Sequence, residues 1–348
     1  MESTDGIMGT CAAGGDEAMK PILSIGIPTY NRAKFLKWNL ESLYGQKRAI
    51  ASGQVEVLVS NNASTDDTDA VVQSYIEHGL PITYFCNVEN IGPDGNFLQC
   101  IAKAQGKYVL LLGDDDLLLD GAVDALVKIL SQEDYGVVYI SGIPYERRRE
   151  KAPAYEAIDV KNETFHEPNK FMRKESYYIT FMSGNIFNKE HLPPFQPEQY
   201  RGTSLIQVPF YLYALCHAKR NLYLKEPFLA VGGNGDNNGG YGLYQVFGVN
   251  LFDMLTSFEK EGLRADTIRA IADDILVNFF PFFIVIAREK ENFIAESLAV
   301  MEKYHGENWR YRYICKPLFS LPLPLAKGYL FLLRCLRKIR RIAMKLAH

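Results

Sequence analysis

The chain has 348 residues, of which 47% are hydrophobic and 23% are charged, a composition typical of a globular protein with one large or two smaller domains. Its formal net charge of −3 argues against a general nucleic-acid-binding protein. The six cysteines form no CxxC pair and have no histidine nearby at zinc-site spacing, which favours reduced thiols inside a cell; they are Cys11, Cys86, Cys100, Cys216, Cys315 and Cys335.

The two ends of the chain differ in composition from its middle. Residues 1–20 are rich in small and acidic residues and lack the apolar segment of a signal peptide, so we expect a disordered leader. Residues 308–348 contain ten Lys or Arg and no Asp or Glu, which leaves 28 basic against 41 acidic residues elsewhere. This basic segment predicts an anionic partner. No uncharged run reaches the ~20 residues that span a bilayer, so we expect a soluble or peripheral protein.

Short apolar runs alternate with helical patterns over the first 140 residues. Such alternation predicts an α/β domain with a largely parallel sheet and helices on both faces. The expected strands are 22–28, 55–59, 82–85, 108–112 and 137–140, and the expected helices are 33–46, 70–76, 97–104 and 121–130.

Three of the most polar loops follow expected strands, after Pro28, Val59 and Leu112. Ligands of parallel α/β sheets bind beyond the carboxyl ends of the strands, where these loops converge. The pattern therefore predicts a binding site built from the three loops.

The second half of the chain has a weaker pattern. A strongly apolar segment at 204–217 and two more at 246–258 and 268–287 predict helices, and a Gly/Asn-rich loop separates the first from the other two. A loop of this composition is either a linker or a lid over a ligand, and we favour a lid. We expect these divisions: a leader at 1–20, a catalytic domain at 21–225, a lid at 226–245, a helical region at 246–320 and a basic amphipathic helix at 321–348.

Three successive aspartates, Asp114, Asp115 and Asp116, follow the apolar strand that ends in LLLG. Adjacent carboxylates repel one another and lose hydration when partly buried, so the cluster is costly without a cation. Mg²⁺ and Mn²⁺ characteristically take one or two carboxylates together with substrate phosphates. The cluster predicts a site for a divalent metal and a diphosphate; capping of the next helix is the alternative, and it explains one aspartate but not three.

The motifs SIGIPTYNR, VLVSNNASTDDT and GKYVLLLGDDD, in this order and spacing, resemble family 2 glycosyltransferases of the GT-A fold, in particular bacterial O-antigen enzymes of the abequosyltransferase type. The resemblance covers residues 21–130. It implies a Rossmann-like sheet that binds a nucleotide sugar, and the apolar segments of the second half add the C-terminal helical region.

The resemblance also implies roles for the matching residues. Asp114 would contact the ribose, and Asp115, shared with Asp116, would bind the metal. The family's uracil-reading Asp is matched here by Asn62, an amide that adds a donor to the acceptor. The remaining residues expected at the donor are Pro28, Thr29, Tyr30, Arg32, Asn61, Gly92 and Asn96, with Tyr30 stacking on the base.

The implied reaction is inverting glycosyl transfer, which requires a general base in the second half of the chain. The family's Glu-Asp pair before the acceptor helix is absent from RGTSLIQVPFYL. Glu198 and Asp236 are the candidates, against the alternative that each is a surface carboxylate. Arg201 and the run Arg147–Arg149 could bind phosphate, although such runs are usually solvated.

From Tyr329 the tail repeats apolar residues near helical spacing, with basic residues on the other side. This composition is typical of an interfacial helix on an anionic membrane; packing on the catalytic domain or oligomerisation is the alternative. Membrane attachment on the cytoplasmic face suits the lipid-linked acceptor that the resemblance implies.

We therefore expect a metal-dependent glycosyltransferase that moves a sugar from a nucleotide diphosphate to a saccharide, a lipid-linked precursor of a surface polysaccharide such as lipopolysaccharide. A sugar nucleotidyltransferase would need a glycine-rich, basic loop after the first strand, which PTYNR lacks. A non-catalytic nucleotide- or sugar-binding protein that retains the fold is the alternative that the uncertain base leaves open.

Overall fold

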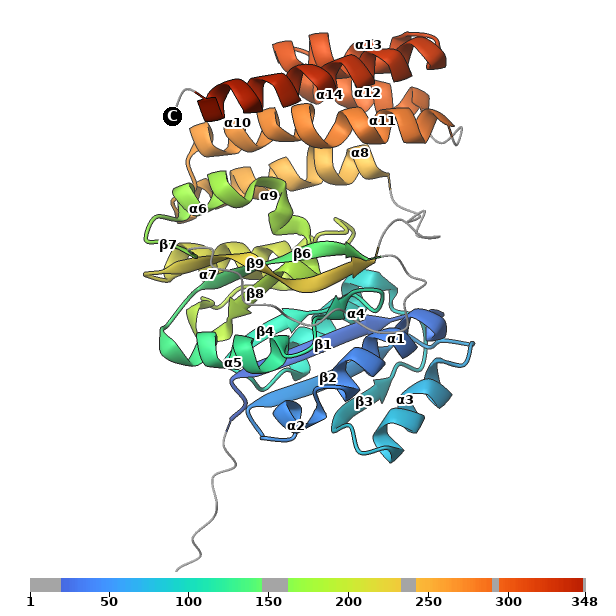
Figure 1. Cartoon of the computed structure of the whole chain (residues 1–348), viewed down its shortest axis with the longest axis vertical. Coiled ribbons are helices and arrows are strands. Elements are labelled where there is room, and N and C mark those ends of the chain that lie inside the picture. Colours follow the sequence, from blue (N-terminus) through green and yellow to red (C-terminus); the bar gives the residue numbers. More distant parts are fainter. Residues whose placement is uncertain (1–19, 146–161, 233–241, 290–293, 347–348) are drawn as a thin grey trace, which may run out of the picture.

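A computed structural model describes residues 20–145, 162–232, 242–289 and 294–346. The predicted leader at 1–20, apart from its last residue, lies outside these ranges, as do Arg147–Arg149, Asp236 and residues 233–241 of the expected lid. The structure is a mixed sheet with helices on both faces, followed by a stack of helices (Figure 1).

The first half of the sheet is parallel, as the apolar runs predict. Strands β1, β2, β3 and β4 lie in the order β3-β2-β1-β4, and all three of their pairings are parallel. Their helices form continuous cores on the two faces of the sheet. The elements are β1 (Leu23–Thr29), α1 (Ala33–Tyr44), α2 (Lys47–Ile50), β2 (Val55–Asn61), α3 (Thr68–Glu77), β3 (Ile82–Cys86), α4 (Gly92–Lys103), β4 (Tyr108–Leu111), β5 (Leu117–Leu118) and α5 (Ala122–Gln132).

The other half of the sheet is mixed, so the expectation of a mostly parallel sheet is wrong for this part. Strand β8 lies antiparallel between β4 and β6, and β9 pairs parallel with β6 but antiparallel with β5 and β7. No sequence periodicity distinguishes these directions, because a buried strand is apolar in either. These elements are β6 (Val137–Tyr145), β7 (Glu163–Phe165), α6 (Pro168–Glu175), β8 (Asn185–Asn188), α7 (Val208–His217) and β9 (Asn221–Gly232).

Strand β9 also moves an expected boundary. Residues 226–232, which we assigned to the lid, belong to this strand, and its apolar side chains Phe228, Leu229 and Ala230 are fully buried. Residues 243–245 begin the helical stack as α8. The remainder of the expected lid lies outside the described residues.

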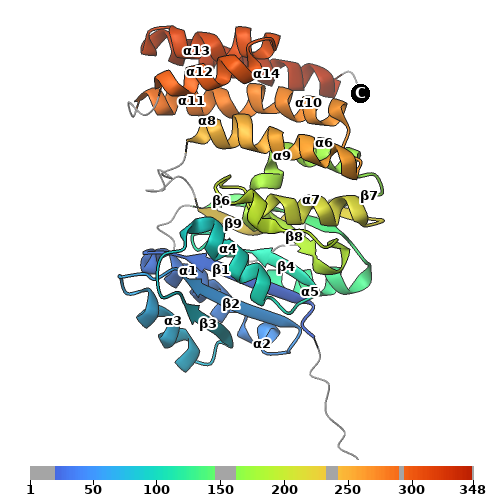
Figure 2. The same cartoon turned by 180° about the vertical axis from the view of Figure 1, so that it is seen from behind.

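The C-terminal helices stack in layers on the side of the sheet away from α1 and α3, and α14 lies in the outermost layer in both views (Figures 1 and 2). The stack consists of α8 (Leu243–Gln245), η5 (Val246–Asn250), α9 (Leu251–Ser257), α10 (Ala265–Asp274), η7 (Ile275–Phe279), α11 (Phe280–Glu289), α12 (Ile294–His305), η8 (Tyr311–Cys315), α13 (Lys316–Ser320) and α14 (Leu323–Leu346).

One continuous helical run, Ala265–Glu289, is long and apolar enough to cross a membrane by length and composition. From the sequence we expected no membrane-spanning segment, because no uncharged run reaches ~20 residues. In the structure this run packs within the stack, where Ile275, Phe280 and Ile284 are fully buried, and 39% of its most apolar stretch is buried.

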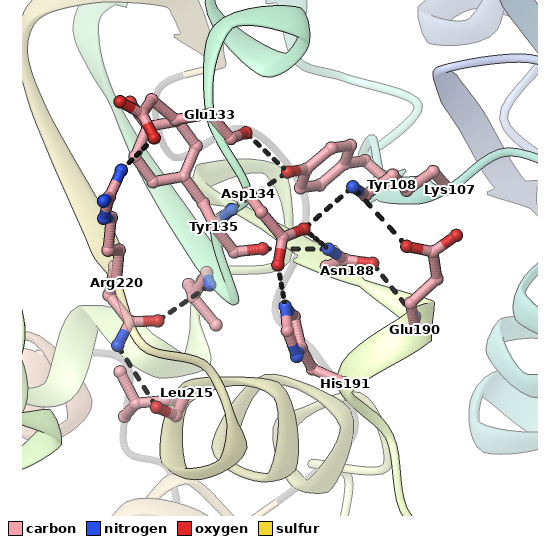
Figure 3. Close-up of polar contacts among 12 residues, drawn as sticks. Lys107, Tyr108, Glu133, Asp134, Tyr135, Asn188, Glu190, His191, Leu215 and Arg220 are labelled. Atoms are coloured by element: carbon pink, nitrogen blue, oxygen red, sulfur yellow. Dashed lines mark hydrogen bonds and ion pairs between the residues drawn. The ribbon is translucent and has the colours of Figure 1, made fainter.

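A polar cluster fastens the antiparallel insertion at the edge of the sheet opposite the three polar loops (Figure 3). Asp134 accepts from Asn188 Nδ2 at 3.0 Å and pairs with Lys107 Nζ at 2.8 Å and His191 Nε2 at 2.7 Å. Lys107 also lies 3.4 Å from Glu190. The cluster joins the start of β4 to the end of β8.

Candidate functional site

The loops after β1 and β2 are tied to each other through Asn31. Its backbone N–H donates to Ser64 Oγ at 2.9 Å, and its Oδ1 accepts from the backbone N–H of Thr65 at 2.7 Å. The N–H of Ala33 donates to Asp66 Oδ2 at 2.9 Å. Asn31 has a φ of 52°, a left-handed conformation that asparagine adopts more readily than most residues. The two polar loops therefore meet, as the sequence predicts.

The third loop brings Asp114 and Asp115 to the loop after β1. Asp114 accepts from Thr29 Oγ1 at 2.8 Å and from Arg32 Nε at 2.7 Å, while Arg32 Nη2 lies 2.8 Å from Asp115 Oδ2. Burial raises the pKa of Asp114 to about 6, although the positive charge of Arg32 opposes this shift. The guanidinium of Arg32 lies over the ring of Phe35. Arg32 thus holds two carboxylates side by side.

Asp116 is held by the protein on both oxygens. It accepts from Ser183 Oγ at 2.6 Å and from the backbone N–H of Gly232 at 3.0 Å. Burial raises its pKa to about 7. Asn39 Nδ2 donates to the carbonyl oxygens of Gly113 and Asp116 at 3.0 and 2.7 Å, which fixes the backbone of the loop. Asp116 therefore joins the first half of the domain to the ends of β9 and the 177–183 segment.

The aspartates fit a metal ion that is coordinated mainly by the bound substrate and water. Among the described residues, no group of three or more His, Cys, Asp or Glu is arranged to hold a metal ion. The Asp115 side chain is the more exposed of the Arg32-linked pair, at 18% against 8% for Asp114. One accessible carboxylate is the arrangement expected for Mg²⁺ or Mn²⁺ that takes its other ligands from substrate phosphates and water.

The three loops open into a cavity of about 1060 Å³. The residues that we expected at the donor and that line it are Pro28, Thr29, Tyr30, Arg32, Asn62, Asn96, Asp114, Asp115 and Asp116. Tyr30 is 42% exposed, as a ring that stacks on a ligand must be in the free protein. Asn61 and Gly92 are not among the lining residues that the structure describes. Asn61 bonds instead to Tyr84 Oη and the Ser64 N–H.

The side chain of Asn62 is fully engaged with the 87–92 segment. Its Nδ2 donates to Asn90 Oδ1 at 2.8 Å and to the Gly92 carbonyl at 3.2 Å. Its Oδ1 accepts from Asn87 Nδ2 and from the Ile91 N–H, both at 3.0 Å. An amide has two donors and one oxygen with two lone pairs, so the protein uses all of them. Asn62 anchors this segment at the cavity.

The structure does not bring Glu198 to the cavity. Glu198 lies in the short turn Pro197–Tyr200, where it is exposed and paired with Arg201. Asp94 lines the cavity instead and accepts from the Gly202 N–H at 2.7 Å; burial raises its pKa. Sequence reasoning missed Asp94, Asn39 and Ser183. Only Asp94 carried a signal, as an acid in the first turn of a helix, and that signal is common at helix N-termini.

Solved glycosyltransferase structures have a similar fold. The chain is similar to Staphylococcus aureus TarS in complex with UDP-GlcNAc, with a TM-score of 0.59 at 18% identity over 93% of this chain and 92% of that one. It is also similar to the Pyrobaculum calidifontis mannosyltransferase PcManGT in complex with GDP-Man and Mn²⁺, with a TM-score of 0.50 at 16% identity over 90% and 88%. The fold is that of a GT-A glycosyltransferase with a C-terminal helical region, which confirms the expected class.

Sequence comparison also finds a matching family model and related bacterial proteins. Residues 24–192 match the model of glycosyl transferase family 2, so this part of the chain is similar to that family. Abequosyltransferase RfbV of Salmonella typhimurium is 34% identical over 113 residues, which are 32% of this chain and 33% of that protein. The GalNAc(5)-diNAcBac-PP-undecaprenol beta-1,3-glucosyltransferase of Campylobacter jejuni is 36% identical over 120 residues, 34% and 37% of the two chains. The chain thus aligns with about a third of the length of these relatives.

Proposed function

We propose that this protein transfers a glycosyl group from a nucleotide diphosphate sugar to a saccharide acceptor. The observation that carries the proposal is the convergence of Tyr30, Arg32, Asp114 and Asp115 on one side of the cavity. Tyr30 offers a ring for the base, and Asp114 offers a carboxylate for the ribose hydroxyls. The ion pair of Arg32 and Asp115 lies where the diphosphate would bind. The TarS structure contains a nucleotide sugar, which supports the same class of donor here.

The residues fit a divalent metal at Asp115, as Mn²⁺ or Mg²⁺ bound together with the diphosphate. Such a metal, when bound, stabilises the negative charge of the departing nucleoside diphosphate. Arg32 lies between two carboxylates. Its planar guanidinium presents five N–H donors, so it can bond to the phosphates as well as to the carboxylates. Asp114 keeps Arg32 and Thr29 in place.

In the reaction, an acceptor hydroxyl oxygen forms a bond to the anomeric carbon while the bond from that carbon to the phosphate oxygen breaks. Attack from the opposite face inverts the anomeric configuration. The hydroxyl proton passes to a general base. Glu198 is not among the described residues that line the cavity, and Asp236 remains a prediction outside the described residues, so we assign the base to neither. Positioning of both substrates in one cavity contributes much of the rate.

We further propose that the acceptor is lipid-linked and that α14 holds the enzyme on an anionic membrane. Ala326 and Leu330 bury one side of α14 against the stack. Leu325, Leu332, Leu336 and Ile339 are 51 to 63% exposed and lie at helical spacing on a second side. Phe331, which is 70% exposed, lies between that side and the exposed residues Arg334 and Lys338. The Arg334 guanidinium lies over the ring of Phe282 in α11. The helix therefore packs on the domain, the alternative considered above, and still presents an apolar and basic face. The side chains from residue 340 onward lie outside the described residues.

The membrane proposal is also supported by the relatives. The Campylobacter jejuni relative is named for a substrate on undecaprenol diphosphate, and RfbV for abequosyl transfer. An apolar face with basic residues is the composition that binds anionic lipid surfaces. A cytoplasmic location on the inner face of the cell membrane, and a role in O-antigen-type polysaccharide synthesis, are part of this proposal.

Turnover of nucleotide sugars tests the proposed activity. The full chain is incubated with UDP-, GDP-, CDP- and dTDP-sugars, with Mn²⁺ or with chelator, and the released nucleoside diphosphate is measured by chromatography. We expect slow, metal-dependent release from one donor, with water as the acceptor, and its loss in Asp115→Ala. Binding of a nucleotide sugar with no release, even with saccharide acceptors added, would favour the non-catalytic binding protein.

A further inference from the structure

The cavity has a second part that the donor proposal does not use. It begins at Ser183 and Gly232, which bond to Asp116, and continues along β6 and β9 to Val246, Phe247 and Phe279 of the helical stack. Figure 1 shows β6 and β9 on the side of the sheet that faces the helices. We call this part, lined by described residues from 139–144, 177–183, 204–207, 223, 231–232, 246–247 and 279, the neutral arm. Its described lining contains no Asp, Glu, Lys, Arg or His.

Six aromatic rings form a continuous wall along the neutral arm. Successive rings lie 4.5 to 6.3 Å apart between centroids, in the order Tyr223, Tyr139, Tyr178, Tyr177, Phe279 and Phe247. All six line the cavity. Tyr178 is 47% exposed, although it stands at the middle of the wall between buried or half-buried rings. An aromatic ring left this open inside a cavity has a face available for a ligand.

Neutral hydrogen-bonding groups lie beside the wall. Gln207 is buried, and its Nε2 donates to the Thr180 carbonyl at 3.1 Å. The reverse orientation of the amide would set two oxygens against each other, so this bond fixes which end of the amide is Oε1. Oε1 has no partner among the described residues. A buried carbonyl without a donor is costly.

We propose that the neutral arm binds uncharged sugar rings of the acceptor, with Tyr178 as the stacking surface. This inference rests on the proposed glycosyl transfer and names the class of its acceptor. A pyranose has an apolar C–H face for an aromatic ring and hydroxyls for groups such as Thr180 and Ser204, which line the arm. A uronic acid or phosphate would meet no cation among the described residues that line the arm, and a buried charge without a partner is costly. An isoprenoid chain would leave the polar groups unpaired.

The location of the arm agrees with this assignment. The arm meets the aspartate loop at Asp116, so a sugar bound against Tyr178 would extend toward the donor side of the cavity. The pKa values of Tyr139, Tyr177 and Tyr223 are raised, first of all by burial, so these hydroxyls remain neutral.

Saccharide binding to the full chain tests the proposal. Calorimetry is run with neutral tetrasaccharides of glucose, mannose, galactose and N-acetylglucosamine, with tetragalacturonate as the charged counterpart and with geranylgeraniol as the isoprenoid. The variants are Tyr178→Ala and Tyr178→Phe, and the matched control is Tyr304→Ala, which removes a similarly exposed ring outside the cavity. Circular dichroism checks that each variant is folded.

We expect one or more neutral tetrasaccharides to bind, with a Kd that rises about tenfold in Tyr178→Ala and stays within about twofold in Tyr178→Phe and Tyr304→Ala. The proposal is overturned if no neutral saccharide binds in a Tyr178-dependent manner, or if tetragalacturonate or geranylgeraniol binds more tightly than every neutral saccharide. Nucleoside diphosphate binding is measured on the same samples. If the unmodified protein binds a nucleoside diphosphate but no saccharide, only this inference is contradicted. If it binds no nucleoside diphosphate, the proposed function is contradicted.

Discussion

Single residues at the site act through a few short polar contacts. Arg32 bonds to Asp114 and Asp115, Asp116 bonds to Ser183 and the Gly232 N–H, and the amide of Asn62 is saturated by the 87–92 segment. These contacts change the interpretation of Asn62. The sequence resemblance implies that Asn62 reads the nucleobase, whereas its hydrogen bonds in the structure hold the 87–92 segment that borders the cavity.

Replacing Asn62 separates these two roles. Asn62→Asp places carboxylate oxygens against Asn90 Oδ1 and the Gly92 carbonyl, so we expect a loss of about 1–3 kcal/mol in the free energy of unfolding and faster hydrogen exchange of the Ile91 amide. Urea titration and exchange mass spectrometry measure these quantities. A variant with unchanged stability and exchange, but a changed preference among nucleotide bases, would show that Asn62 reads the base directly. Asn90→Ala, which removes one partner, should cause a smaller change of the same kind.

At the scale of elements, the parallel strands were predictable and the antiparallel insertion was not. Apolar runs that end in polar loops give β1, β2 and β4 and the site at their carboxyl ends, because a loop's position follows from strand direction. The pairing of β4 with β8 joins residues about 80 apart in the chain and depends on tertiary packing. The aromatic wall was missed for the same reason, since Tyr139, Tyr178, Tyr223 and Phe279 come from separate elements and each resembles an ordinary core residue.

The cluster that joins β4 to β8 predicts a pH dependence of stability. Burial raises the pKa of Asp134, but hydrogen bonds from Lys107 and His191 outweigh burial and lower it below its usual value of 3.8. The stabilisation is therefore fully present above the unfolded-state pKa and is lost as the pH falls through the folded-state pKa. We expect Asp134→Asn to lower the free energy of unfolding at pH 7 by about 1 kcal/mol or less, because the pair is partly exposed.

The difference in the free energy of unfolding between Asp134→Asn and the unmodified protein should disappear in strongly acidic solution, where Asp134 is protonated in both the folded and the unfolded state. Thermal unfolding measured from pH 7 downward checks it, with Asp120→Asn as the control at an exposed acid. A difference between Asp134→Asn and the unmodified protein that stayed constant down to the lowest pH would contradict the assignment to charge.

At the scale of the whole molecule, the donor loops lie at the carboxyl ends of β1, β2 and β4, and the helical stack lies on the side of the sheet away from α1 and α3, with α14 in its outermost layer (Figures 1 and 2). The cavity extends from the first to the second, with the neutral arm between them. A lipid-linked acceptor held at α14 would therefore lie on the same side of the sheet as the arm that we propose for its sugar.

The membrane proposal predicts that charge on α14 controls vesicle binding. Replacing Arg334 and Lys338 with serine removes about 1 kcal/mol each, so we expect about a 30-fold weaker partition onto vesicles that contain phosphatidylglycerol. Co-sedimentation at low and high salt measures it. The control is Lys219→Ser with Lys260→Ser, two exposed lysines away from α14. Equal binding of the two double variants would place the membrane contact elsewhere.

The central claim is a metal-dependent nucleotide diphosphate site at Asp115. Calorimetric titration with UDP, GDP, CDP and dTDP, with Mn²⁺ and with chelator, tests it on the unmodified protein, on Asp115→Ala and on the control Asp120→Ala. We expect one nucleotide to bind only with metal, to weaken about 100-fold or more in Asp115→Ala, since a metal contributes several kcal/mol at such a site, and to bind normally in Asp120→Ala. A folded protein that binds none of the four under any condition, or whose binding is unchanged in Asp115→Ala, would contradict the account.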